Sequence, residues 1–291
     1  MPARSLNTID ARTTGTTYMN ARDHHFTHPP LVEVVLGLQF SPVAGISSLH
    51  LGQFAGTLAA EFPKSNDAAP LDPHFEQFGE PFGLAAAAVQ RHWKPTGTRL
   101  QLRSDGGERL LQIQNGRFVL NWRRTGDPYP TFRQLQPMFE GYLDGFKSFV
   151  AGVSGAAIRP EQWEIMYLNH IPRGPLWSSV ADWSSILPGL LGTPSPLAQC
   201  EIETCGGRWS YRLPDCEGRL HIEASHAALR ESDSGIDTPV MVLQIAARGS
   251  AQAQGTDMLL ADRMRIGHDA IVKAFVEITG TSAHTVWGIA R

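Results

Sequence analysis

The sequence lacks the features that define membrane-spanning and disulfide-rich secreted proteins. No apolar run approaches the roughly 18 to 20 residues that a membrane helix needs. The N-terminal segment has no apolar stretch before a small-residue cleavage site, so it does not resemble a Sec signal. The three cysteines, Cys200, Cys205 and Cys216, are odd in number and too sparse for a disulfide framework. These absences predict a soluble cytoplasmic protein with reduced thiols and no membrane partner.

The common catalytic and metal-binding motifs are also missing. There is no GxxxxGKS or GxxxxGKT phosphate loop, no HExxH helix, no GxSxG elbow and no strand-following GxGxxG turn. His24, His25 and His28 lie in a polar segment with no frame to fix ligand geometry. Cys200 and Cys205 are five residues apart, which turns them to opposite faces of one strand. We therefore predict no cofactor and no metal site.

The composition is that of a globular protein with an uneven distribution of charge. The 291 residues are 42% hydrophobic and 9% aromatic, enough for one large or two medium domains. The formal net charge is −3. However, residues 91–133 contain nine basic and three acidic residues, whereas residues 200–248 contain eight acidic and five basic ones. The negative net charge of the chain argues against wholesale nucleic-acid binding. The basic segment 91–133 indicates a local binding surface.

Hydrophobic spacing predicts alternating strands and helices in the first half. Residues 1–28 are polar and aperiodic, which predicts a flexible tail. The segment LVEVVLGLQF (31–40) alternates as a half-buried strand does. The elements expected after it are a helix over 47–62, a loop over 63–83, strands over 84–93, 98–104 and 109–124 with a turn at Asn115-Gly116, and a helix from Pro130 to Val150 that Pro137 kinks or restarts.

The second half repeats this order. QWEIMYLNHI (162–171) can be laid over residues 31–40, which places Glu164 over Glu33. A helical segment over 177–191, strands over 198–213, 218–229 and 240–249, and a helix over 260–278 follow. We predict an α+β fold of two tandem strand, helix, antiparallel meander, helix repeats, over residues 29–157 and 158–291. Two such copies across a pseudo-twofold axis would form a saddle like that of the TATA-binding protein, an analogy of fold alone.

Several motifs occur in an order that resembles one bacterial family. They are PPLVEVVLGLQF, NGRFVLNWRR followed by YPTF and a Phe-rich helix, YLNHI, and HDAIVKAF with AHTVWG. Together they cover nearly the whole chain after the tail and resemble a sporadically distributed family of bacterial proteins of about this length, without a settled activity. The resemblance implies no catalytic residues, and the patchy distribution of the family fits a mobile or defence-associated function.

The basic strands predict a polar surface on one face of the sheet. Because side chains alternate along a strand, the leucines and aromatic residues of these strands turn to the core and the polar residues turn away. Arginine offers a planar donor fork for carboxylate or phosphate groups. The predicted binding residues are Arg99, Gln101, Arg103, Gln112, Gln114, Arg117, Asn121 and Arg123. The alternative is a solvated sheet face without a partner.

Two carboxylates, Glu33 and Glu164, belong to this polar layer. The interpretation we favour is that each is a counter-charge to strand-borne arginines, and we include both in the binding surface. The alternative is an enzyme of unknown reaction with a cleft between the repeats, using Glu33, Glu164 and His170, with Tyr167 as a further candidate.

The favoured function is therefore a non-enzymatic binding protein. Its Arg/Gln sheet face would take up an acidic protein surface, with a nucleic-acid backbone as the second option. A protein partner is preferred because the whole chain is acidic and exposed aromatic residues for base stacking are not evident. Homo-oligomerisation through open sheet edges is compatible with either function.

Overall fold

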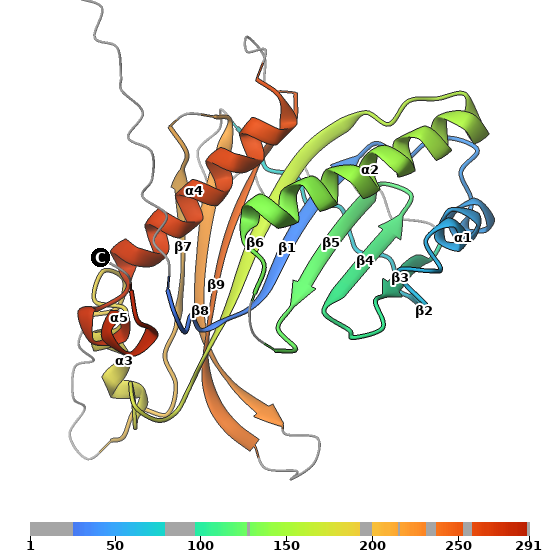
Figure 1. The fold of residues 1–291 in the computed structure, drawn as a ribbon. Coiled ribbons are helices and arrows are strands. Elements are labelled where there is room, and N and C mark those ends of the chain that lie inside the picture. Colours follow the sequence, from blue (N-terminus) through green and yellow to red (C-terminus); the bar gives the residue numbers. More distant parts are fainter. Residues whose placement is uncertain are drawn as a thin grey trace, which may run out of the picture.

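An antiparallel sheet with α1, α2 and α4 packed on one face forms the body of the molecule (Figure 1). The computed structural model describes residues 26–78, 97–126, 129–192, 200–214, 216–230, 237–252 and 258–289. Its nine strands follow the order β2-β3-β4-β5-β1-β6-β9-β8-β7, and every neighbouring pair is antiparallel. The α+β class predicted from the sequence is confirmed.

The elements lie in two successive groups along the chain. The first group contains β1 (Leu31–Phe40), α1 (Ser48–Thr57), β2 (Lys64–Ala68), β3 (Arg99–Arg103), β4 (Arg109–Gln114), β5 (Arg117–Arg123) and α2 (Phe132–Ser154). The second contains β6 (Pro160–Pro172), the 3-10 turn η1 (Val180–Asp182), α3 (Trp183–Ile186), β7 (Gly207–Arg212), β8 (Gly218–Arg230), β9 (Asp237–Ser250), α4 (Leu260–Ile278) and α5 (Thr281–Trp287). The first strands of the two groups, β1 and β6, pair in the middle of the sheet.

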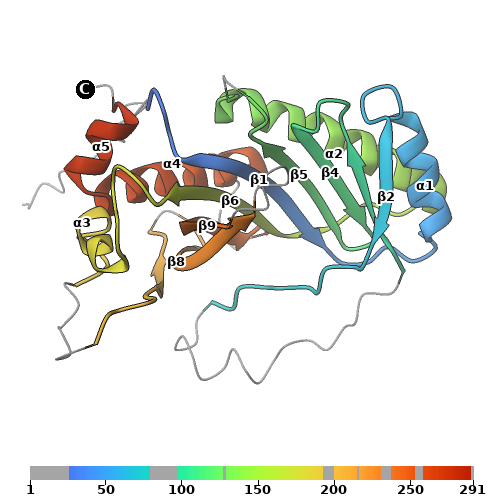
Figure 2. The ribbon, with the colours of Figure 1, turned by 90° about the horizontal axis from the view of Figure 1, so that it is seen from below.

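The hydrophobic core lies between the sheet and the helices. On β1 and β6, Leu36 pairs with Ile165 and Leu38 with Trp163, and all four side chains are fully buried on the helix side. In the first half, Phe118 of β5 stacks on a phenylalanine of α2, with ring centroids 5.2 Å apart. The alternation of the sequence thus leaves the opposite face to polar residues. Figure 2 views the molecule from below, with α2 and α4 along one side of the sheet.

Five local expectations differ from the structure. Residues 64–68, expected as loop, form β2 because they pair with β3 in spite of low strand propensity. Residues 200–206 are not a strand, and only η1 and α3 are helical within 177–191. Helix α2 runs through Pro137 and does not restart there. The end of the expected tail is ordered: Phe26 is buried, and Thr27 and His28 bond to the backbone of the C-terminal segment. The strand expected over 84–93 lies outside the described residues.

The close approach of α4 to the sheet predicts opposite effects of alanine at two helical glycines. A Cβ at Gly267 would lie 2.5 Å from the Trp163 ring, whereas a Cβ at Gly145 on the exposed side of α2 would meet nothing within 4 Å. Gly267→Ala should lower the free energy of unfolding by about 1–3 kcal/mol through overpacking. Gly145→Ala should raise it by about 0.5–1 kcal/mol because glycine is a poor helix former. Urea unfolding checks both, and equal effects would contradict the packing described.

Candidate functional site

Strand register gathers the predicted binding side chains on the sheet face opposite the helices. Arg117 pairs with Gln114 and Gln39, Asn121 with Leu110 and Val35, and Arg123 with Glu33, so these positions share one face. Gln101 and Arg103 on β3 continue the same rows, since they pair with Gln112 and Leu110 of β4, and Arg99 shares their parity along the strand. We call this surface the polar face. The side-chain parity predicted from the sequence holds for all three strands.

The centre of the polar face differs from the open surface that we expected. Gln112, Gln114 and Asn121 are only 8%, 4% and 5% exposed, whereas Arg103 and Arg123 at the rim are exposed. The amides at the centre bond to one another and to charged neighbours. These bonds run from Arg99 Nη1 and Gln101 Nε2 to Gln112 Oε1 (2.8 and 3.1 Å), from Gln112 Nε2 to Asn121 Oδ1 (2.8 Å), and from Asn121 Nδ2 to Glu33 Oε1 (2.6 Å). The exposed donors are therefore at the rim.

Residues 71–78, which we call the strap, cross the polar face (Figure 2). Three glutamine side chains bond to the strap backbone, each as donor and acceptor at 2.7–3.0 Å: Gln114 at Leu71, Gln39 at His74, and Gln162 at His74 and Glu76. The glutamines lie in one row across β4, β5, β1 and β6. This row spans three strand spacings, about 14 Å, and five extended residues span roughly 16–18 Å. The strap is thus extended at right angles to the strands.

Glu76 anchors the strap at the second half of the sheet. Its carboxylate is 4% exposed and contacts Arg219 Nη1 and His221 Nε2, both at 2.7 Å, with Arg248 Nη1 at 4.0 Å. Burial alone would raise the pKa of Glu76. The hydrogen bonds and charges of His221 and Arg219 outweigh burial and lower that pKa to about 2. Glu76 is therefore ionised at neutral pH and ties the strap to β8 and β9.

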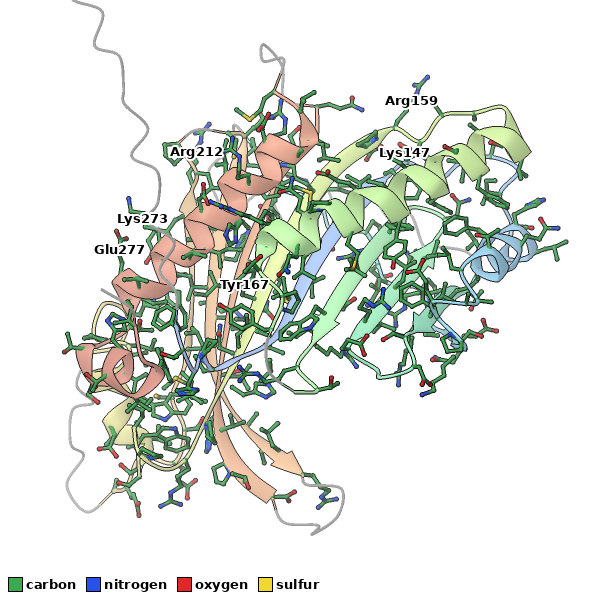
Figure 3. The ribbon with its side chains drawn as sticks, viewed as in Figure 1. Lys147, Arg159, Tyr167, Arg212, Lys273 and Glu277 are labelled. Carbon is green, nitrogen blue, oxygen red and sulfur yellow. The ribbon has the colours of Figure 1, made fainter. Side chains whose placement is uncertain are left out.

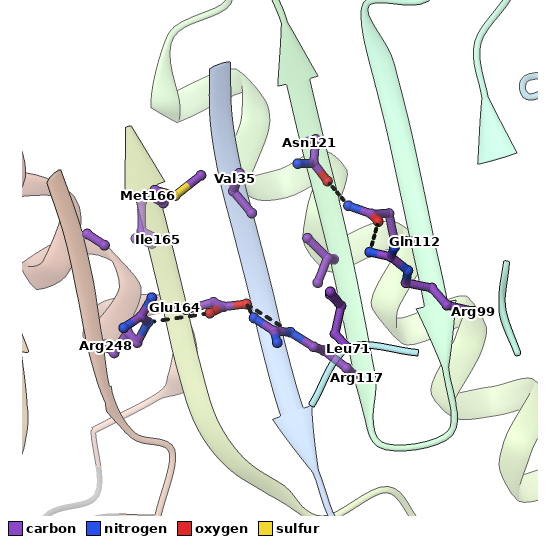
Figure 4. Close-up of a pocket in the computed structure, with 12 residues that line it drawn as sticks. Val35, Leu71, Arg99, Gln112, Arg117, Asn121, Glu164, Ile165, Met166 and Arg248 are labelled. Carbon is purple, nitrogen blue, oxygen red and sulfur yellow. Dashed lines mark hydrogen bonds and ion pairs between the residues drawn. The ribbon is translucent and has the colours of Figure 1, made fainter. Parts of the chain in front are cut away.

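A second buried carboxylate, Glu164, joins the two halves of the polar face. Arg117 on β5 donates through Nε to Glu164 Oε1 at 3.1 Å and forms a closer contact through Nη2, and Arg248 Nε lies 3.6 Å from Oε2 (Figure 4). Strand β1 lies between β5, which carries Arg117, and β6, which carries Glu164. The two side chains meet across Gly37 of β1, where an added Cβ would lie 2.5 Å from Glu164 Oε1. A glycine at this position is what permits the contact.

A cavity of about 240 Å³ lies beside the strap on the polar face (Figure 4). Its polar lining consists of Arg99, Gln112, Arg117, Asn121, Glu164 and Arg248, and its apolar lining includes Val35, Leu71, Val119, Met166 and Ala246. Strands from both halves contribute. Of the eight arginine and amide residues predicted from the sequence, four line this cavity: Arg99, Gln112, Arg117 and Asn121.

The residues of the enzyme alternative do not converge on this cavity. Glu164 lines it, but Glu33 contacts Asn121 and, at 3.4 Å, Arg123. Tyr167 points to the helix side (Figure 3), where its hydroxyl bonds to His268 Nδ1 at 2.9 Å, and burial raises its pKa far above the usual range. Glu33 and Glu164 thus occupy separate contacts, as counter-charges to strand-borne arginines.

Sequence reasoning missed the strap and the residues that hold it. Gln39, Gln162, Arg219 and Arg248 turn to the polar face by the alternation of their strands, which was a usable signal. Gly37 inside a strand also indicated a close approach of another group. The strap itself has no periodicity, so nothing local in its sequence predicted its path.

No helix among the described residues is long and apolar enough to cross a membrane. Within the same residues, no group of three or more His, Cys, Asp and Glu side chains could hold a metal ion; His24 and His25 lie outside them. No protein-family model matches the chain, and no curated protein matches it.

Proposed function

We propose that this is a non-enzymatic binding protein whose polar face receives an acidic segment of a partner protein. The observation that carries the proposal is the surplus of arginine on that face. In the first half, Arg99, Arg103, Arg117 and Arg123 share the face with the carboxylates of Glu33 and the neighbouring Glu164. Arg103 forms no ion pair with any described residue, and Arg123 is 44% exposed beside Glu33. Exposed guanidinium groups of this kind are complementary to carboxylates.

A protein is the better partner than a nucleic acid for this surface. The chain has a formal net charge of −3, which disfavours a long phosphate backbone with a charge on every nucleotide more than a short acidic segment with few charges. Single-stranded nucleic acids also need aromatic platforms for their bases. Among the exposed large hydrophobic side chains of the described residues, only Tyr211 is aromatic, and it lies on the edge strand β7, away from the arginine rim.

A charge-reversal comparison tests the proposal. Arg103→Glu/Arg123→Glu changes the rim of the polar face, and Lys147→Glu/Lys273→Glu makes the same change in charge on the helix side (Figure 3). We expect the first variant to weaken the binding of a fluorescein-labelled Glu/Ala peptide at least tenfold in anisotropy titrations, and the second to leave it within about twofold. A labelled DNA duplex should bind more weakly than the peptide at the same salt concentration. Equal losses in the two variants, or preferred binding of DNA, would contradict the proposal.

We extend the proposal to the location, the family and the biological role of the protein. It includes a cytoplasmic location, a place in the bacterial family that the ordered motifs resemble, and a defence-associated role. A comparison of phage plating on host strains with and without the protein tests the last of these. Self-association would use the exposed edge strands β2 and β7. The enzyme alternative has no observation that favours it, because its residues do not share a cavity.

We also propose that the chain is an internal duplication arranged about a pseudo-twofold axis as a TATA-binding-protein-like saddle. Two observations support this. The strand order reads β1-β5-β4-β3 outward on one side and β6-β9-β8-β7 on the other. In the overlay of residues 31–40 on 162–171, Val35 corresponds to Met166, and these two residues are direct cross-strand partners. An experimental structure in which one half superposes on the other by a rotation near 180° is the expected result.

A further inference from the structure

The cavity beside the strap contains more positive than negative charge. Arg99, Arg117 and Arg248 line it, together with one carboxylate, Glu164. Arg117 and Arg248 both contact that carboxylate, and Arg248 also lies 4.0 Å from Glu76. Even with Glu76 included, three arginines face two carboxylates. The unbalanced charge belongs to Arg99, which forms no ion pair within the described part of the chain.

Arg99 also has an unused donor. Its Nη1 donates to Gln112 Oε1 at 2.8 Å, but its Nε is buried and has no hydrogen-bond partner among the described residues. Burial and the positive charge of Arg117 both lower the pKa of Arg99. A buried donor without an acceptor is unfavourable, and so are two neighbouring guanidinium groups without a shared anion. A negatively charged acceptor in the cavity that Arg99 and Arg117 line would balance the charge of Arg99 and reduce the repulsion between the two guanidinium groups.

The size and walls of the cavity limit what that acceptor can be. The cavity volume is about 240 Å³. It lies below the roughly 300–1,000 Å³ of pockets for drug-sized ligands. Val35, Val119, Met166 and Ala246 provide apolar walls, and Leu71 of the strap adds to this apolar lining. A carboxylate on a stem of a few methylene groups is small enough for this space.

We propose that this cavity binds a single carboxylate carried on a short apolar stem, with Arg99 as its principal ligand. The inference deepens the function proposed above, on which the identity of the source rests: the carboxylate is that of a glutamate or aspartate side chain in the acidic segment of the partner. The rim arginines then attract the segment, and the cavity selects one of its side chains.

Titration of the full-length protein with sodium butyrate, followed by amide chemical shifts, tests the inference. Butyramide is the uncharged match in shape. We expect butyrate to shift amides of β3, β5 and β9 around the cavity and butyramide to leave them unchanged. Arg99→Gln removes the unbalanced charge, and Ala246→Met fills the cavity without altering any charge. Each variant should abolish the amide shifts caused by butyrate while the rest of its spectrum stays native. If one variant fails to fold, the other still tests the inference. Equal shifts with butyramide, no shifts with butyrate, or undiminished shifts in the variants would overturn the inference.

A peptide with one glutamate between alanines separates this inference from the proposed function. If butyrate and the peptide both bind and both lose binding in Arg99→Gln, both proposals are supported. If butyrate binds and the peptide does not, the carboxylate site stands with a free small molecule as its source, and the acidic protein partner is overturned. If the peptide binds through Arg103 and Arg123 and neither cavity variant affects it, the binding function stands and the carboxylate cavity is overturned.

Discussion

Replacing Glu76 by glutamine is expected to release the strap and to lower the free energy of unfolding by about 3 kcal/mol at neutral pH. Glu76 is buried against Arg219 and His221 at 2.7 Å. Removing one member of a buried charge cluster leaves the others without a counter-ion, which typically costs about 3–5 kcal/mol. Urea unfolding measures the loss, and limited proteolysis within residues 71–78 measures the release.

The same carboxylate predicts a pH dependence of known sign. Its pKa falls from the ordinary glutamate value of 4.5 to about 2 in the folded protein. Because the pKa is lower in the folded protein, Glu76 contributes its full stabilisation when the pH is above the unfolded pKa of about 4.5. This contribution is lost as the pH falls from about 4.5 to about 2. The shift corresponds to about 3 kcal/mol at 1.36 kcal/mol per unit. Wild-type stability should therefore fall more steeply than that of Glu76→Gln over this range.

A surface carboxylate on the same face provides the control. Glu223 accepts a hydrogen bond at 2.9 Å from Arg208, whose side chain is 80% exposed. Glu223→Gln should change the free energy of unfolding by no more than about 0.5–1 kcal/mol, since exposed ion pairs contribute little. Similar losses in Glu76→Gln and Glu223→Gln would show that the strap is not held by a buried charge cluster.

Glu164→Gln is expected to have an effect of similar size, because Glu164 is the carboxylate that joins β5, β6 and β9 through Arg117 and Arg248. The loss should be about 3–5 kcal/mol, since two partly buried guanidinium groups lose their shared counter-ion. A double-mutant cycle with Arg117→Met isolates the pair. We expect the double variant Arg117→Met/Glu164→Gln to be more stable than the sum of the single losses predicts, by about 1–3 kcal/mol. Additive losses would contradict the coupling.

The alternation of polar and apolar residues along each strand made the polar face predictable from the sequence. The centre of this face was not predictable, because long-range contacts determine it. The parity of Arg103, Arg117 and Arg123 is a local property of each strand, so it could be read from the sequence. The strap is held by contacts over large separations: Gln39 and His74 are 35 residues apart, and Arg219 and Glu76 are 143 residues apart. No local pattern encodes such contacts, which is why an open surface was expected where a covered one exists.

Long-range pairing also explains why β2 was expected as a loop. Strand β2 consists of Lys64–Ala68, a polar segment that becomes a strand by pairing with β3. Its charged and polar side chains suit an exposed sheet edge, where they discourage pairing with other chains. Strand propensity alone gives no sign of it, because the tertiary pairing decides the conformation.

Hydrogen–deuterium exchange of the full-length protein, with and without the Glu/Ala peptide, tests the central claim most directly. Binding on the polar face should slow exchange in β3, β5 and the strap and leave α2 and α4 unchanged. Slower exchange confined to the helices, or no change anywhere at a peptide concentration that saturates binding, would contradict the assignment of the polar face as the binding surface.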